Sequence, residues 1–288
     1  MKKKMLLAIS LLFTGLFIAA CGNSEESGGE ADQDKLAEIQ EAGKLVMGTS
    51  PDYPPFEFYV LDDEGERQIV GSDIQLAKAI AEELGVELEI KATDFNGVIA
   101  NIQSNAVDIG LAGFNYTEER NKVMQFSEGY AQEATIGYQG LMVTKETAEK
   151  YNSLEEIEDA NLAIGAQGGS IQYELAQDLT TETKIKQYGT LDVGLAALNE
   201  GDIDAMVVAT SSAEPMIASF PDLTILPEEN FNLDPEDLYT KVMAGFPLGE
   251  EYDSLIEEVN KVIKEAKENG DIEKWQDEAK ELSLEAVE

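Results

Sequence analysis

Residues 71–90 read GSDIQLAKAIAEELGVELEI, and this stretch decides the fold. Apolar residues recur at helical spacing from Ile74 to Leu84, which predicts a helix with one buried face. Gly85 is suited to end that helix, because glycine adopts the left-handed conformation of a helix C-terminus without strain. Apolar residues then alternate over 86–90, which predicts a strand.

The alternation of helix and strand continues on both sides of this stretch. A short helix around Leu36 and Ile39, ended at Gly43, precedes a predicted buried strand at 45–47. A helix over 98–102 precedes a strand at 108–111. Strands that alternate with helices predict an α/β fold, whose mostly parallel sheet is covered on both faces.

A second set of elements predicts a second lobe with its own α/β core. Strands are expected at 141–143, 162–165 and 205–208, with helices from Ser170 and over 193–198. The chain then returns to the first lobe through a strand at 241–244 and two charged amphipathic helices. We therefore predict a first lobe over 35–138 and 230–288, and a second lobe over 139–229. Two crossings between the lobes predict a hinge, and a hinge between α/β lobes predicts a ligand cleft at the strand ends.

Composition excludes several classes of function. The chain has 58 acidic and 20 basic residues and a formal charge of −38, which makes nucleic acid an implausible partner. It has no histidine, so catalytic triads and metal sites that depend on histidine are excluded. The single cysteine excludes an internal disulfide. No cofactor is implied.

The N-terminus predicts export and a lipid anchor. Lys2, Lys3 and Lys4 precede an apolar run over 5–20, which ends in small residues before Cys21. The run falls short of the about 20 apolar residues of a membrane-spanning helix, although an ordinary signal peptide or a membrane anchor is the alternative. We predict a lipoprotein signal over 1–20, lipidation at Cys21, and a disordered tether over 21–34. The protein would then lie on the extracellular face of the cell membrane.

Four blocks of sequence carry a family resemblance, and they are residues 44–58, 71–80, 111–120 and 164–172. In this order they resemble the extracellular solute-binding proteins of polar amino acid ABC transporters, from about Lys35 to Trp275. The resemblance implies a type II periplasmic-binding-protein fold with two hinge crossovers. It also implies a monomer that closes on an amino acid or related small carboxylate and delivers it to ABC permease subunits.

Arg120 is the main candidate for ligand binding. Its planar guanidinium can hold a carboxylate through two parallel hydrogen bonds, while the alternative is a surface ion pair with Glu118 or Glu119. The resemblance implies that Arg120 binds the ligand's α-carboxylate. Gly113 and Asn115 match the family positions that complete this carboxylate site.

The other candidates come from both lobes. Tyr53 and Phe95 match the positions that hold the ligand's side chain between two aromatic faces, although each could be a core residue. Gln167 matches a polar pocket position. Ser170 and Ile171 follow two glycines at a helix N-terminus, whose free N–H groups suit an anion, and a nucleotide-binding loop is the competing interpretation.

One departure from the family concerns the ligand's ammonium group. Ala209 stands where the family has an acid that pairs with this group, so we expect either another acid or a ligand without a free ammonium. Glu214 is the first candidate replacement. Ser50 stands where relatives that bind basic amino acids carry an acid, which disfavours a cationic side chain.

Two other functions remain open at this stage. An enzyme of the dehydratase type on the same fold would need a Glu or Asp of raised pKa as proton donor. A sensory surface lipoprotein cannot be separated from an importer subunit by sequence.

Overall fold

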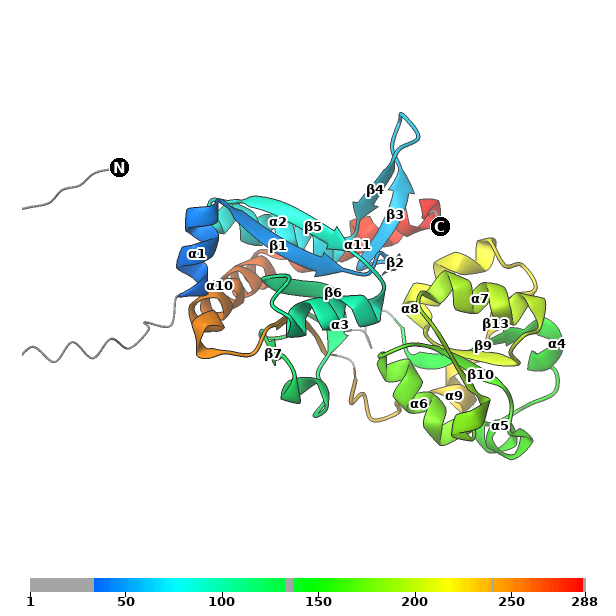
Figure 1. Ribbon diagram of the computed structural model, residues 1–288. Helices are drawn as coiled ribbons and strands as arrows, with labels where there is room; N and C mark the ends of the chain where they lie inside the picture. The colour runs from blue at the N-terminus through cyan, green and yellow to red at the C-terminus, as the bar shows by residue number, and fades with distance from the viewer. Residues whose placement is uncertain (1–33, 133–136, 240, 287–288) are drawn as a thin grey trace, which may run out of the picture. The chain divides into compact units, whose positions relative to one another are not determined.

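The computed structural model describes residues 34–132, 137–239 and 241–286, and these residues belong to one compact unit (Figure 1). The predicted signal peptide, Cys21 and residues 21–33 of the predicted tether lie outside the described residues. Within the described part, no helix is both long and apolar enough to cross a membrane.

The first large sheet has the strand order β5-β1-β6-β14-β7, and β8 also pairs with β14. Its strands are β1 (Lys44–Thr49), β5 (Glu87–Ala92), β6 (Ile109–Asn115), β7 (Gln125–Phe126), β8 (Ala131–Gln132) and β14 (Lys241–Phe246). β1 pairs in parallel with β5 and β6, whereas β14 runs antiparallel to β6. The sheet is therefore parallel at its centre, and its return strand comes from the C-terminal part of the chain.

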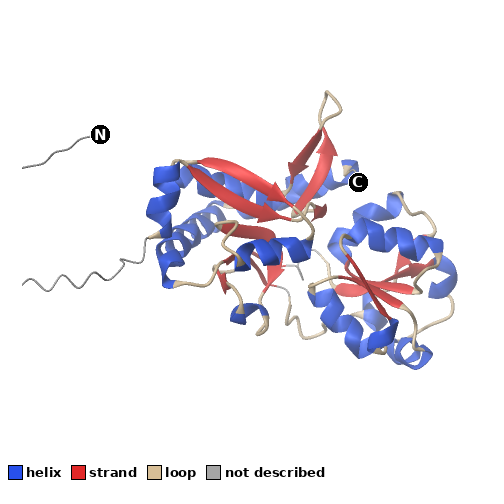
Figure 2. Ribbon diagram, viewed as in Figure 1, coloured by secondary structure: helices blue, strands red, loops and turns tan. Residues whose placement is uncertain are grey.

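Helices cover both faces of this sheet (Figure 2). One face packs against α1 (Lys35–Ala42), α2 (Ser72–Leu84), α10 (Asp253–Asn269) and the start of α11 (Asp271–Leu282). The other face packs against α3 (Phe95–Gln103), and η1 (Arg120–Lys122) follows β6. The short η5 (Glu250–Tyr252) precedes α10, and its Tyr252 packs on the first face. As predicted, α1 and α2 each end at a glycine in the left-handed conformation, Gly43 and Gly85.

The second large sheet has the order β11-β10-β12-β9-β13. Its strands are β9 (Gln139–Thr144), β10 (Ile164–Gln167), β11 (Ile185–Tyr188), β12 (Ala205–Ala209) and β13 (Leu223–Ile225). β10 pairs in parallel with β11 and β12, and β9 runs antiparallel to β12. The second sheet, like the first, is therefore parallel at its centre. It is packed by hydrophobic residues of its own.

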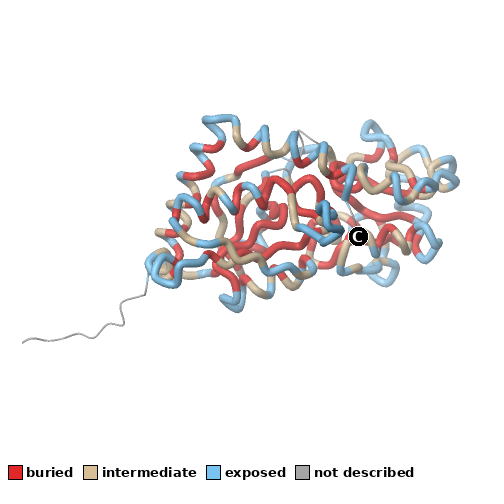
Figure 3. The backbone as a smooth tube through the Cα atoms, turned by 90° about the horizontal axis from the view of Figure 1, so that it is seen from above, coloured by how far each residue is buried: buried red, intermediate tan, exposed pale blue. Residues whose placement is uncertain are grey.

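The second sheet is also covered on two faces. Its cores include α5 (Leu154–Ala160), α6 (Ile171–Leu179) and α9 (Glu228–Phe231) on one side, and α7 (Leu191–Glu200), α8 (Thr210–Ala213) and η4 (Glu214–Ala218) on the other. The shorter α4 (Lys145–Ala148) follows β9, and η3 (Glu182–Lys184) precedes β11. In Figure 3 the buried segments lie mainly in the interior, and the exposed segments lie at the periphery.

A small third sheet was not predicted from the sequence. β2 (Asp52–Tyr53), β3 (Glu57–Leu61) and β4 (Arg67–Val70) pair antiparallel. Phe58 and Val60 of β3 pack against Ala279 of α11, close to η6 (Ser283–Glu285). This sheet brings the end of the chain next to the loop that follows β1.

The chain passes from the first large sheet to the second between β8 and β9, and returns between β13 and β14. The predicted limits of the lobes, 35–138 with 230–288 and 139–229, remain a prediction. The described residues place β1 and β10 at the centres of two separate parallel sheets, and both strands lead into loops that approach each other at the candidate site.

Candidate functional site

A small cavity, here called the inner cavity, has walls from the loops after β1, β6 and β10. Its volume is about 20 Å³. All eight predicted ligand-binding residues line it, together with five others; the predicted residues are Tyr53, Phe95, Gly113, Asn115, Arg120, Gln167, Ser170 and Ile171. The structure thus brings the candidates together, and their part in binding remains a prediction.

Arg120 is buried in this cavity wall, with 6% of its surface exposed. Its Nη1 donates to the carbonyl oxygen of Asn115 at 2.8 Å, and its Nη2 donates to the carbonyl oxygen of Gly169 at 3.1 Å. Burial lowers the pKa of Arg120 to about 10, which still leaves the guanidinium charged near neutral pH. The alternative of a surface ion pair is wrong, since Glu119 pairs instead with Lys122.

Two buried donors of residues that line the inner cavity have no partner among the described residues. They are Nε of Arg120 and Nδ2 of Asn115. Buried donors without partners are costly, so this end of the cavity is suited to an anion with two acceptor oxygens.

Gly113 stands where a side chain cannot. Its φ is +59°, and a Cβ atom there would lie 2.7 Å from Cε1 of Tyr53. Its N–H donates to Oδ2 of Asp73 at 3.2 Å. Glycine is required at this position because the backbone is left-handed and the tyrosine ring approaches it closely.

The two aromatic candidates also pack against aromatic neighbours. The ring of Tyr53 stacks on Phe56 with centroids 5.6 Å apart. Phe95 contacts Phe114 at 5.1 Å, and the guanidinium carbon of Arg120 lies 5.3 Å from the Phe95 centroid. Phe95 is thus a core residue as well as part of the cavity wall.

The second lobe contributes the loop between β10 and α6. Ser170 caps α6, because its Oγ accepts from the N–H of Tyr173 at 3.2 Å and donates to the carbonyl of Gln167 at 2.7 Å. Nε2 of Gln167 donates to Oδ2 of Asp52 at 2.9 Å. Gly169 lies against Asn96 of α3, where a Cβ would be 2.2 Å from Oδ1. This loop therefore reaches the first lobe closely.

Asp52 is a functional candidate that the sequence analysis missed. Its Oδ1 accepts from Oγ of Ser50 at 2.7 Å, and its Oδ2 also accepts from the N–H of Leu191 at 2.7 Å. Leu191 is the first residue of α7. The residue at the N-cap position of this helix, Thr190, makes no side-chain hydrogen bond to the helix. Asp52 therefore caps a helix of the second lobe from the first lobe, and we call its bonds to Leu191 and Gln167 the Asp52 clasp. Burial raises the pKa of Asp52 to about 6.

Glu57 is the second missed carboxyl group. It is completely buried in the cavity wall, and neither of its oxygens has a hydrogen-bond partner within the described part of the chain. Burial, and then the negative charges of Asp73 and Asp52, raise the pKa of Glu57 well above its usual range. A cation placed beside Glu57 would reverse this shift. The signal in the sequence was an acid between Phe56 and Phe58, in the middle of an apolar run.

The expected replacement for the acid missing at Ala209 lies elsewhere. Ala209 is buried at the end of β12, Glu214 is solvent-exposed, and neither lines the inner cavity. Asp52 and Glu57 are the acids that line this cavity, and the group that pairs with the ligand's ammonium stays a prediction, as does the effect of Ser50 on cationic side chains. Among the described residues, no group of histidine, cysteine or acidic side chains is arranged to hold a metal ion.

Comparisons with known proteins agree with this geometry. Residues 45–279 match the model of the bacterial extracellular solute-binding proteins, family 3. The arginine-binding extracellular protein ArtP of Bacillus subtilis (strain 168) is 32% identical over 279 residues, which cover 95% of this chain and 96% of ArtP.

Two solved structures have the same two-lobed fold. The amino acid ABC transporter substrate-binding protein AbpA of Streptococcus pneumoniae Canada MDR_19A, bound to L-arginine, is 34% identical with a TM-score of 0.77, over 86% of this chain and 99% of that one. The ancestral amino acid-binding protein AncCDT-1, a precursor of cyclohexadienyl dehydratase, is 29% identical with a TM-score of 0.71, over 85% and 98% of the two chains.

These similarities extend over nearly the whole folded part, and the relatives are amino acid-binding proteins of transporters. The fold is the α/β type II fold of periplasmic binding proteins, as predicted. The chain belongs to the bacterial extracellular solute-binding proteins of family 3.

Proposed function

We propose that this protein is the lipid-anchored substrate-binding component of an ABC importer, and that it captures an amino acid by closure of its two lobes. One observation carries the proposal. The inner cavity is lined by Arg120 and Asn115, which carry two unpaired buried donors, and also by the half-buried carboxyl group of Asp52 and the buried one of Glu57. This polarity is the complement of an amino acid, which has a carboxylate and at least one cationic group.

The two ends of the ligand take different partners. The α-carboxylate binds Arg120 and Asn115, where bidentate geometry is available. The carboxyl groups of Asp52 and Glu57 receive the cationic part. Two carboxyl groups favour a basic amino acid, and the arginine-binding relatives support arginine as the first candidate.

Binding requires the cavity walls to separate. A volume of about 20 Å³ is room for about one or two water molecules, far less than an amino acid needs. The contact from Arg120 to Gly169 O joins the two lobes directly, so we infer that the ligand's carboxylate replaces Gly169 as the partner of Arg120. The ligand's carboxylate would then replace the hydrogen bond between Arg120 and the carbonyl of Gly169, so Arg120 keeps a partner when the lobes separate.

The anchor and the destination of the ligand belong to the same proposal. Cys21 after an apolar run supports a lipid anchor on the extracellular face of the membrane, and delivery to permease subunits follows from the family. A role as an enzyme is not proposed, because the relatives named above are binding proteins.

Calorimetric titration tests the proposal. The purified protein is titrated with arginine, lysine, histidine, glutamine and glutamate, and we expect the tightest binding for a basic amino acid. Arg120→Ala should cost about 2 to 5 kcal/mol of binding free energy, because the carboxylate stays buried without its partner. Lys122→Ala, which removes an exposed cation of the same 3₁₀ helix, is the matched control. If none of the five amino acids binds, the proposal is refuted.

A further inference from the structure

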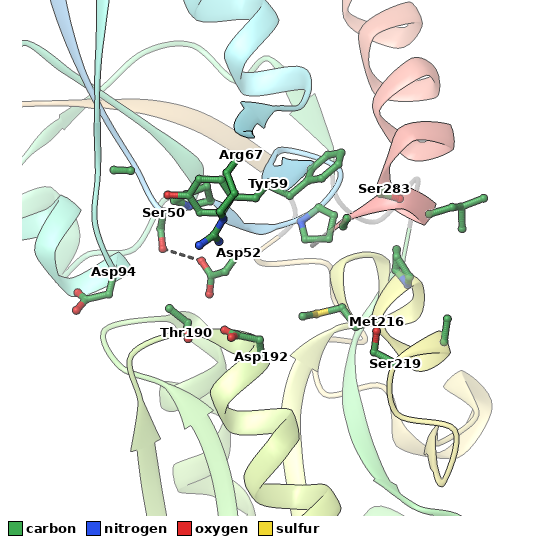
Figure 4. A pocket seen from close by; sticks show the side chains of 18 of the residues that line it. Ser50, Asp52, Tyr59, Arg67, Asp94, Thr190, Asp192, Met216, Ser219 and Ser283 are labelled. Atoms are coloured by element: carbon green, nitrogen blue, oxygen red, sulfur yellow. Dashed lines mark hydrogen bonds between the residues drawn. The ribbon is translucent and has the colours of Figure 1, made fainter. Parts of the chain in front are cut away.

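A second and much larger cavity lies beside the inner cavity (Figure 4), and we call it the outer cavity. Its volume is about 320 Å³, within the range of small-molecule sites. Ser50 and Asp52 line both cavities, so the Asp52 clasp forms the wall between them. The other walls come from β3, β4, the loop before α3 and the C-terminal η6 in the first lobe, and from the start of α7 and η4 in the second.

The walls of the outer cavity combine an apolar surface with carboxyl groups. Its apolar lining residues include Pro51, Pro54, Phe58, Met216 and Leu284. At one end lie the side chains of Asp52 and Asp192, whereas the carboxylate of Asp94 points away from this space, and Met216 lies toward the other end (Figure 4). An organic molecule with an apolar body would therefore bury that body against one part of the wall.

The carboxyl end has an excess of negative charge. Burial raises the pKa of Asp52, and the negative charge of Asp192 raises it further. The negative charge of Asp94 is partly offset by a hydrogen bond, because its Oδ1 caps α3 by accepting from the N–H of Gly97 at 2.7 Å. Arg67 is the cation among the lining residues, and its guanidinium carbon lies 3.9 Å from the ring centroid of Tyr59. A cation between Asp52 and Asp192 would relieve the repulsion between these like charges.

We propose that the outer cavity is a second binding site, for an organic cation carried on an apolar body. Two sources have this chemistry. One is a separate small amine, which needs no part of the inner cavity. The other is the distal group of a longer ligand whose carboxylate binds Arg120, and this form rests on the proposed function.

Tyramine is the first probe, since it has an aromatic body, a primary ammonium and no carboxylate. We expect saturable binding to the wild-type protein by calorimetry, unchanged in Arg120→Ala. Asp192→Asn should weaken tyramine binding at least tenfold, and Ser219→Trp, which fills the cavity from η4, should abolish it. Glu200→Gln removes an exposed charge at the far end of α7 and should leave binding within twofold of wild type. Circular dichroism verifies that each variant is folded.

The dipeptide tyrosylarginine distinguishes the two sources. A ligand that spans both cavities loses affinity in Arg120→Ala and in Asp192→Asn, whereas free arginine loses affinity only in Arg120→Ala. Absence of saturable binding of both probes up to about 10 mM would overturn the proposal, as would equal loss of tyramine binding in Asp192→Asn and Glu200→Gln. If the wild-type protein binds tyramine but none of the five amino acids, the proposed function is refuted and the outer site still stands.

Discussion

Asp52 joins the two lobes, and its replacement tests whether the clasp stabilises the closed form. Oδ2 accepts from the N–H of Leu191 at 2.7 Å and from Nε2 of Gln167 at 2.9 Å, and both donors belong to the second lobe. Asp52→Ala removes the acceptor for both. Loss of a helix cap costs about 0.5 to 2 kcal/mol. We expect the clasp to form again when the lobes close on the ligand, so its loss should lower the observed affinity by about 2- to 30-fold.

Asp52→Asn keeps a hydrogen-bond acceptor at this position and removes the negative charge, so it tests the two roles separately. Asparagine is as good a cap as aspartate. Burial raises the pKa of Asp52 to about 6, so its negative charge is disfavoured at this position. If Asp52 acts only as a clasp, the Asn variant binds every ligand within a few-fold of wild type. If it also receives the ligand's cation, the Asn variant loses affinity for arginine and keeps its affinity for glutamine.

The assay is calorimetry with arginine and glutamine, together with small-angle X-ray scattering of the ligand-free protein. The Ala variant should show a larger radius of gyration than wild type, because its lobes separate more readily. Asp202→Ala, an exposed acid beyond the other end of α7, is the control. Wild-type affinity and an unchanged radius in Asp52→Ala would show that the clasp contributes nothing to closure.

Three further predictions follow from single positions. Gly113→Ala should lower the free energy of unfolding by at least about 1 kcal/mol, because φ is +59° and the new Cβ meets Tyr53; thermal denaturation measures it, and an unchanged melting temperature would contradict it. Burial raises the pKa of Asp73 to about 6, so its contribution to stability is greatest below its ordinary pKa and is lost as pH rises through about 6. Wild type should therefore lose more stability between pH 5 and pH 7 than Asp73→Asn, and parallel denaturation curves would refute this. Cys21→Ala should release the protein from the membrane fraction without changing its melting temperature, whereas continued membrane association would place the anchor elsewhere.

The elements that could be predicted are those whose signals are local. The apolar spacing from Ile74 to Leu84 and the glycine at 85 predicted α2 and its end, because a helix buries one face and glycine relieves strain at its C-terminus. β3 and β4 were missed because the acidic residues between them resemble an ordinary loop. Their strand pairing depends on packing against α11, which is distant in the sequence.

The residues of the candidate site also divide into those with a local sequence signal and those without one. Arg120, Gly113 and Tyr53 stood inside recognisable blocks, and the structure brings them into one wall. Asp52 and Glu57 stood in the same blocks, but the burial of a carboxyl group is a property of the tertiary structure and has no local signal. Glu214 was chosen because it follows β12 closely; α8 comes between them, and Glu214 is exposed beyond it.

The central claim is that Arg120 binds the α-carboxylate of an amino acid, and one cycle of four titrations tests it most directly. Arginine and agmatine, which is arginine without its carboxylate, are each titrated into wild type and Arg120→Ala. We predict that wild type binds arginine at least about 30-fold more tightly than agmatine, the lower limit expected for loss of one partner of a buried charge pair, and that Arg120→Ala removes most of this difference. If agmatine binds wild type as tightly as arginine, or if the preference for arginine survives in Arg120→Ala, the carboxylate is bound elsewhere and the claim is wrong.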